Sequence, residues 1–152
     1  MKRPLIYITA IIALFTGILF FSDTKSVAGP AKKTEAGITF IEQDWDKALQ
    51  QAKAENKLVF LDIYATWCGP CKLLKKNTFT DKKVGDFFNK TFVNVSIDGE
   101  KGVGPQLAQK FGITAYPSLI VANADGKPVL YTMGYIDAAT LLSFADAALK
   151  RK

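Results

Sequence analysis

The chain has 152 residues, 49% of them hydrophobic and 22% charged, a composition that favours one folded domain and excludes a disordered tail. It contains no histidine and only two cysteines, which excludes a Cys-His protease and a four-ligand zinc site within the chain, so we expect no bound metal. The net charge of +6 comes with scattered lysines and no basic run interleaved with aromatic residues, so we expect no nucleic-acid partner.

Residues 1–28 are predicted to be a targeting segment. Two basic residues near the start precede an uncharged apolar run at 5–21, and the small residues Ser26 and Ala28 form a cleavage site. We therefore expect a signal peptide that is cut after Ala28. The alternative is an uncleaved anchor to the inner membrane through residues 5–21, which would span only roughly 26 Å. Either way, we expect the domain to lie in the periplasm or another extracytoplasmic space.

Residues 29–37 are polar and rich in residues that break regular structure, so we expect a linker followed by one domain at 38–152. The domain starts with a short β-like run at 38–41. Asp44 is then expected to cap a helix with one apolar face, and this helix ends near Asn56.

The run at 58–65 is apolar on both faces except for Asp62, which is typical of a central strand covered by helices on both sides. A helix is expected to begin around Cys68 and to continue to Thr78, because Pro70 is tolerated in a first helical turn. The pattern then predicts, in order, a helix after Asp81, a strand at 92–97, a helix from Gly104 to Gly112, a hairpin of strands at 118–122 and 129–133, and a helix after Asp137. The element order β-α-β-α-β-α-β-β-α indicates the α/β class.

The only two cysteines, Cys68 and Cys71, flank Gly69 and Pro70 directly after the apolar strand. A cysteine pair between a buried strand and the start of a helix is typical of a dithiol that cycles with a disulfide. The alternative is a structural disulfide. Bridging such near neighbours closes a very small loop and constrains the unfolded chain little, so the sequence favours redox chemistry.

The segments 62–72 (DIYATWCGPCK) and 114–118 (TAYPS) resemble the thioredoxin superfamily, and the likeness covers about residues 38–150. Within the superfamily, residues 61–84 (LDIYATWCGPCKLLKKNTFTDKKV) look most like the C-terminal periplasmic domain of the transmembrane disulfide reductase DsbD. The resemblance implies a thioredoxin fold, with a central mixed β-sheet flanked by helices, and a thiol-disulfide oxidoreductase that needs no cofactor.

The resemblance also implies a catalytic role for three residues. Cys68 would be the nucleophile of a redox-active Cys68–Cys71 disulfide, with Cys71 as the resolving cysteine, because a thiolate attacks a disulfide and a helix N-terminus stabilises that thiolate. Asp62 would exchange a proton with Cys71, although an aspartate at a solvated strand edge is an equal expectation from the strand alone. Thioredoxins have a lysine near this aspartate, and Asn94 stands at the matching position here.

Five residues are expected to bind substrate. Pro117 would be a cis-proline facing the dithiol, although most X-Pro bonds are trans, and Tyr116 would present its backbone to the substrate unless it is an ordinary turn aromatic. Trp67 would form part of the docking surface, with a core aromatic as the alternative. Gly69 and Pro70 would shape the turn and set its redox balance.

These features favour an extracytoplasmic thiol-disulfide oxidoreductase that mainly reduces disulfides in exported proteins. Its partners would be protein disulfide substrates and, since such a reductant must be recharged, a membrane electron donor such as a DsbD-like transporter. We expect a monomer. The alternatives are an oxidase or isomerase, a specialised reductase such as one for cytochrome c maturation, a thioredoxin-fold binding or assembly module, and delivery of Cu(I) by the two cysteines.

Overall fold

The computed structural model describes residues 36–151. The predicted signal peptide or anchor at 1–28 and most of the predicted linker lie outside these residues, so the domain boundaries stay predictions. None of the helices between residues 36 and 151 combines the length and the apolar character needed to cross a membrane.

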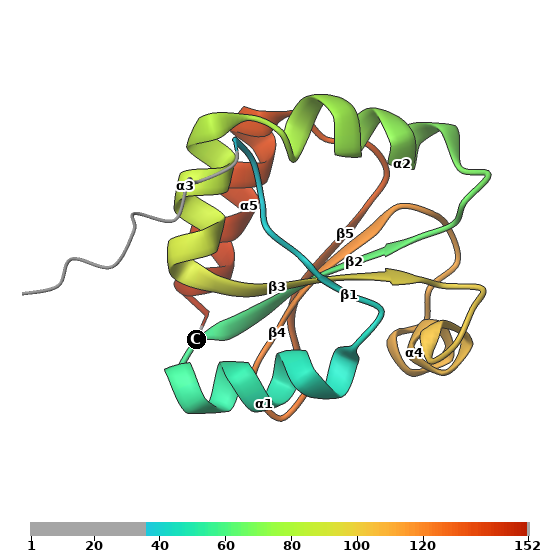
Figure 1. Cartoon of the computed structure of the whole chain (residues 1–152), viewed down its shortest axis with the longest axis horizontal. Coiled ribbons are helices and arrows are strands. Elements are labelled where there is room, and N and C mark those ends of the chain that lie inside the picture. The colour runs from blue at the N-terminus through green and yellow to red at the C-terminus, as the bar shows by residue number, and fades with distance from the viewer. Residues whose placement is uncertain (1–35, 152) are drawn as a thin grey trace, which may run out of the picture. The chain divides into compact units, whose positions relative to one another are not determined.

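A five-stranded sheet with the order β1-β3-β2-β4-β5 forms the centre of the described part of the chain (Figure 1). Strands β1, β3 and β2 are parallel to one another, whereas β4 and β5 form an antiparallel hairpin that joins the sheet beside β2. The strands are β1 Ile41–Glu42, β2 Leu58–Tyr64, β3 Phe92–Asp98, β4 Ser118–Ala122 and β5 Pro128–Met133. The predicted mixed α/β sheet is therefore confirmed, and the apolar run at 58–65 provides the central strand.

Helices cover both faces of this sheet (Figure 1). The helices α2, α3 and α5 lie over one face, and α1 and α4 lie over the other. The helical segments are α1 Trp45–Glu55, α2 Gly69–Leu73, the π-helix η1 Leu74–Thr78, α3 Lys82–Thr91, α4 Gly104–Phe111 and α5 Ala138–Leu149. An apolar core fills the space on each side, and four phenylalanines pack in these cores, namely Phe79, Phe87, Phe88 and Phe111.

Local capping explains where most of these helices begin. Asp44, Asp81 and Asp137 each accept a hydrogen bond from the backbone N–H three residues later, at 2.8–3.0 Å. Asn56 and Gly112 adopt the left-handed conformation that ends α1 and α4. These contacts lie within single segments of the chain, so the sequence pattern was sufficient to predict them.

The structure differs in two details from the helix predicted at 68–78. It begins at Gly69, with Cys68 as its N-cap, and its second half is a π-helix in which the backbone N–H of Phe79 donates to the carbonyl of Leu74 at 3.0 Å. The hydroxyl of Thr78 donates to the carbonyl of Ile136 at 2.8 Å, which ties the end of this wider turn to the segment before α5.

Candidate active site

The two cysteines form a disulfide at the point where the loop after β2 enters α2. Both are buried, with 2% and 3% of their surfaces exposed. The Sγ atom of Cys68 accepts a hydrogen bond from the backbone N–H of Cys71 at 3.1 Å, so the sulfur lies where the unpaired N–H groups of the helix can stabilise a negative charge.

The Tyr116–Pro117 segment lies beside this disulfide. Its peptide bond is cis, as the resemblance implied, and Tyr116 packs against the buried cluster formed by the two cysteines and Ala65. The ring of Tyr116 also lies close to Gly99, since a Cβ added there would come within 2.6 Å of the tyrosine hydroxyl. The Tyr116 ring can therefore lie here only because Gly99, the residue after β3, has no side chain.

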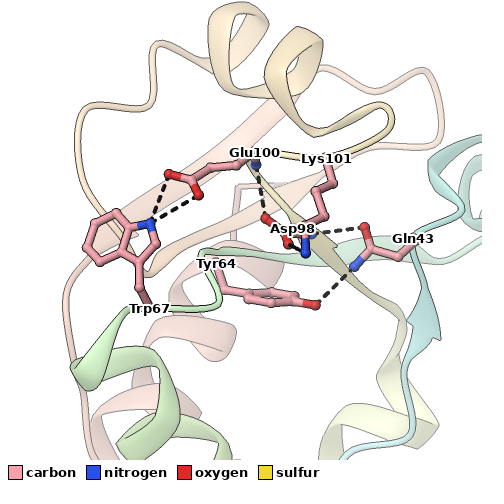
Figure 2. Close-up of polar contacts among 6 residues, drawn as sticks. All are labelled: Gln43, Tyr64, Trp67, Asp98, Glu100 and Lys101. Atoms are coloured by element: carbon pink, nitrogen blue, oxygen red, sulfur yellow. Dashed lines mark hydrogen bonds and ion pairs between the residues drawn. The ribbon is translucent and has the colours of Figure 1, made fainter.

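Trp67 is an exposed neighbour of the disulfide rather than a core residue. Its side chain is 67% exposed, and its ring meets that of Tyr116 edge to face with centroids 6.1 Å apart. The indole Nε1 donates to both carboxylate oxygens of Glu100 at 3.0 Å (Figure 2). No pattern in the sequence predicted this contact with Glu100. Gly69 and Pro70 are exposed as well, so three of the predicted substrate-binding residues lie on the surface around the buried cysteines.

Asp62 is buried in β2, with 1% of its surface exposed, so the solvated-edge alternative is wrong. The register sets it opposite Ser96 of β3, whose hydroxyl donates to Oδ2 at 3.0 Å. Its Oδ1 atom accepts no hydrogen bond from residues 36–151. Burial raises the pKa of Asp62 to about 6, while the charge of Lys75 and the bond from Ser96 act in the opposite direction and nearby Glu42 adds to the rise.

Asn94 does not take part in the contacts of Asp62. It lies opposite Phe60, two residues before Ser96, and its side chain donates to the carbonyl of Thr39 and to Oδ1 of Asn89. Ser96 was missed at the sequence level. The parallel register of β2 and β3 would have identified it, but that register depends on tertiary packing.

Tyr64 ends β2 and is held by a network of polar residues (Figure 2). Gln43 donates from Nε2 to the Tyr64 hydroxyl at 3.1 Å and accepts from the backbone N–H of Asp98 at 3.0 Å. Lys101 forms an ion pair of 3.4 Å with Asp98. On the ring face, Nζ of Lys75 lies 3.4 Å from the centroid.

Among residues 36–151, no group of three or more His, Cys, Asp or Glu side chains could hold a metal ion.

A family model described as a thioredoxin-like domain matches residues 45–149. The chain belongs to this thioredoxin-like family. It is 26% identical over 148 residues to the thiol:disulfide interchange protein DsbD of Pseudoalteromonas atlantica, a match that covers 91% of this chain and 25% of that protein. It is 32% identical over 120 residues to DsbD of Salmonella typhi, covering 76% of this chain and 20% of that protein. This thioredoxin-like chain thus spans a quarter or less of these relatives' length.

Solved structures also resemble this thioredoxin-like protein. A candidate disulphide-isomerase from Bacteroides thetaiotaomicron is 43% identical, with a TM-score of 0.68 over 77% of this chain and 97% of that chain. The oxidised C-terminal domain of DsbD from Neisseria meningitidis has a TM-score of 0.59 at 22% identity, over 70% of this chain and 97% of that chain, and this likeness concerns the fold. The predicted resemblance to the thioredoxin superfamily and to DsbD is confirmed.

Proposed function

We propose that this thioredoxin-like protein is a thiol-disulfide oxidoreductase that reduces disulfides in exported proteins. The observation that carries the proposal is the buried Cys68–Cys71 disulfide at the start of α2, packed beside Tyr116 of the cis-proline segment. Disulfide exchange needs an accessible path to one sulfur and a second sulfur within reach of it. The disulfide shows that the second sulfur lies within reach of the first, and the exposed Trp67, Gly69 and Pro70 flank the pair at the surface.

The proposed reaction consists of two exchanges. In the reduced protein the Cys68 thiolate attacks one sulfur of the substrate disulfide, and the other substrate sulfur leaves with the electron pair and takes up a proton. Cys71 then gives its proton to the carboxylate of Asp62, and its thiolate attacks the sulfur of Cys68. The remaining substrate sulfur leaves and is protonated. Two electrons have passed to the substrate, and the Cys68–Cys71 disulfide is restored.

Asp62 suits the role of proton acceptor in this scheme. With its pKa raised to about 6 by burial, the group is mostly a carboxylate at neutral pH but needs little free energy to take up a proton. The hydrogen bond from Ser96 orients Oδ2, and Oδ1 has no hydrogen-bond partner among the described residues. Tyr116 would pair its backbone with an extended substrate segment next to the disulfide.

We place the reaction outside the cytoplasm on the basis of the predicted export signal at 1–28 and of relatives called thiol:disulfide interchange proteins. Protein disulfides persist in such compartments. A soluble reductant there must be reduced again after each turnover. We therefore propose a membrane electron donor of the DsbD type as its second partner.

Mixed-disulfide trapping tests the proposal. In Cys71→Ala, the second exchange cannot occur, so substrates should stay attached to Cys68 and be released by dithiothreitol. Cys68→Ala is the matched control and should yield no adducts. Equilibration of the wild-type protein with glutathione buffers would give the redox potential, which we expect to lie toward the reducing end. If no adducts form and the wild-type dithiol does not react with protein disulfides, the protein is a binding module rather than a reductase.

Isomerase activity is a second candidate, favoured by the 43% identity to the candidate disulphide-isomerase from Bacteroides thetaiotaomicron. An isomerase must rearrange wrong disulfides without net transfer of electrons. Refolding of scrambled ribonuclease by catalytic amounts of the protein, with no added reductant beyond a glutathione buffer, separates the two activities. A reductase accelerates loss of the disulfides, whereas an isomerase restores native ribonuclease activity.

A further inference from the structure

Lys75 occupies an unusual position among the lysines that follow the cysteine pair. It lies in η1 and is half-buried, whereas Lys72 and Lys76 on the same helical segment are exposed. Its Nζ atom lies 3.4 Å from the centroid of the Tyr64 ring, a close cation–π contact. The ammonium group is therefore held at the sheet surface instead of extending into solvent.

The aromatic ring beneath this ammonium is itself fixed. Gln43 binds the Tyr64 hydroxyl and also the backbone of Asp98, which connects the ring to β3 (Figure 2). Gln43 has a φ of 59°, a left-handed conformation that is uncommon for residues other than glycine. Because side chains alternate along a strand, Tyr64 and Asp62, two residues apart in β2, lie on the same side of the sheet.

The groups around Asp62 contain one source of positive charge. Ser96 of β3 donates a hydrogen bond, Leu119 of β4 lies opposite it in the antiparallel register, and no described residue forms an ion pair with Asp62. The charged groups that act on it are Lys75 from η1, which favours the carboxylate, and Glu42 from β1, which disfavours it. Asp98 of β3, Tyr64 of β2 and, when reduced, Cys71 of α2 are further titratable groups on this side.

We infer that Lys75 is a positioning residue for the proton transfer, held by the Tyr64 ring so that its charge keeps Asp62 in the carboxylate form that accepts the proton of Cys71. The inference rests on the proposed function for its chemical meaning. In the second exchange, the S–H bond of Cys71 breaks and its proton passes to Asp62, while the Cys71 sulfur keeps the electron pair and bonds to the sulfur of Cys68. The bond between Cys68 and the substrate sulfur breaks, and the substrate sulfur leaves with that electron pair and is protonated by solvent. A more protonated Asp62 cannot accept that proton, so loss of the Lys75 charge should slow this step below neutral pH.

NMR titration of the carboxyl carbon of Asp62 in the oxidised protein tests the inference directly. The wild-type midpoint should lie at about 6. Lys75→Met keeps the aliphatic stem and removes the charge, so the midpoint should rise by about 0.5–1 pH unit. Lys75→Arg keeps the charge and should leave the midpoint near the wild-type value. Lys76→Met removes an exposed charge from the same segment and is the matched control, with no expected change.

The rate of insulin reduction provides a functional readout, measured in single turnovers between pH 5 and 8. In Lys75→Met, the acidic limb of the pH profile should shift to higher pH by the same amount as the Asp62 midpoint. A Lys75→Met midpoint equal to that of Lys76→Met would overturn the inference, even if activity falls. If wild-type protein fails to reduce insulin and traps no substrate, the proposed function fails, while the titration alone still decides whether Lys75 controls Asp62.

Discussion

The two faces of the central sheet differ in chemistry although the same two strands, β2 and β3, form the middle of both. The face under α1 and α4 receives only apolar side chains from them, namely Val59, Leu61, Ile63, Val93, Val95 and Ile97. The face under α2, α3 and α5 begins with Leu58, Phe60 and Phe92 but also receives Asp62, Asn94, Ser96 and Asp98. One face is therefore an uninterrupted core, and the other combines a core with a buried polar group of residues.

This difference separates stability from chemistry. The strict two-residue alternation of a strand allows one sequence to serve both purposes, because each residue faces a single side. A buried carboxylate costs free energy when it is charged. The two buried aspartates of these strands, Asp62 and Asp98, both lie on the face that carries the cysteine pair. Substitutions on the apolar face should consequently change the free energy of unfolding by the same amount at every pH, whereas the effect of substitutions at Asp62 should differ between acid and neutral pH.

Leu61→Ala on the apolar face should have the largest effect on stability. Leu61 is fully buried and lies between Val95 and Ile120 in the sheet. The substitution leaves a cavity and should lower the free energy of unfolding by about 2–5 kcal/mol, equally at pH 4 and pH 7. Urea denaturation of the oxidised protein measures both values. Leu73→Ala is the control, because Leu73 is 51% exposed and its loss should cost less than about 0.5 kcal/mol.

Asp62→Asn on the polar face should raise the free energy of unfolding at neutral pH but not at acid pH. The folded-state pKa of Asp62 is raised from 3.8 to about 6, so the wild-type folded state binds this proton more tightly than the unfolded state. Wild-type stability therefore falls as the pH rises from about 4 to 6. The asparagine has no proton to lose and should be more stable than wild type by about 2–3 kcal/mol at pH 7, with no difference near pH 4.

Urea denaturation at pH 4, 5, 6 and 7 gives this profile for the oxidised proteins. Asp146→Asn makes the same chemical change at an exposed aspartate of α5 and is the matched control. A constant difference for Asp62→Asn would mean that the carboxyl group has an ordinary proton affinity. The proton transfer proposed for Asp62 would then lose its physical basis.

The features that the sequence predicted correctly are those fixed by neighbouring residues. Asp44, Asp81 and Asp137 bind backbone groups three residues away, so their caps follow from local pattern. The apolar run at 58–65 predicted the central strand because only a strand covered on both faces buries every residue. The pairing of Cys68 with Cys71 was predicted from their place between the apolar strand and a helix start, whereas the cis-proline was predicted from the likeness to the thioredoxin superfamily.

The features that were missed depend on pairs brought together by the tertiary fold. Trp67 and Glu100 are 33 residues apart, so no local pattern predicted that the exposed indole of Trp67 donates to Glu100. Lys75 could not be distinguished from its exposed neighbours without the position of Tyr64. The contact of Ser96 with Asp62 required the strand register, which no local pattern specifies.

Glu100→Gln at the rim of the polar face should have the smallest effect. The glutamine retains one acceptor for the indole of Trp67 but lacks the charge, and because the contact is exposed, stability should fall by less than about 1 kcal/mol. The indole N–H of Trp67 should exchange with solvent about 2–5-fold faster, as measured by NMR, with buried Trp45 as the internal reference. Glu55→Gln, an acceptor for Gln51 on α1, should leave this exchange rate unchanged. Equal exchange in Glu100→Gln and wild type would mean that Tyr116, rather than the carboxylate, holds the tryptophan at the rim of the site.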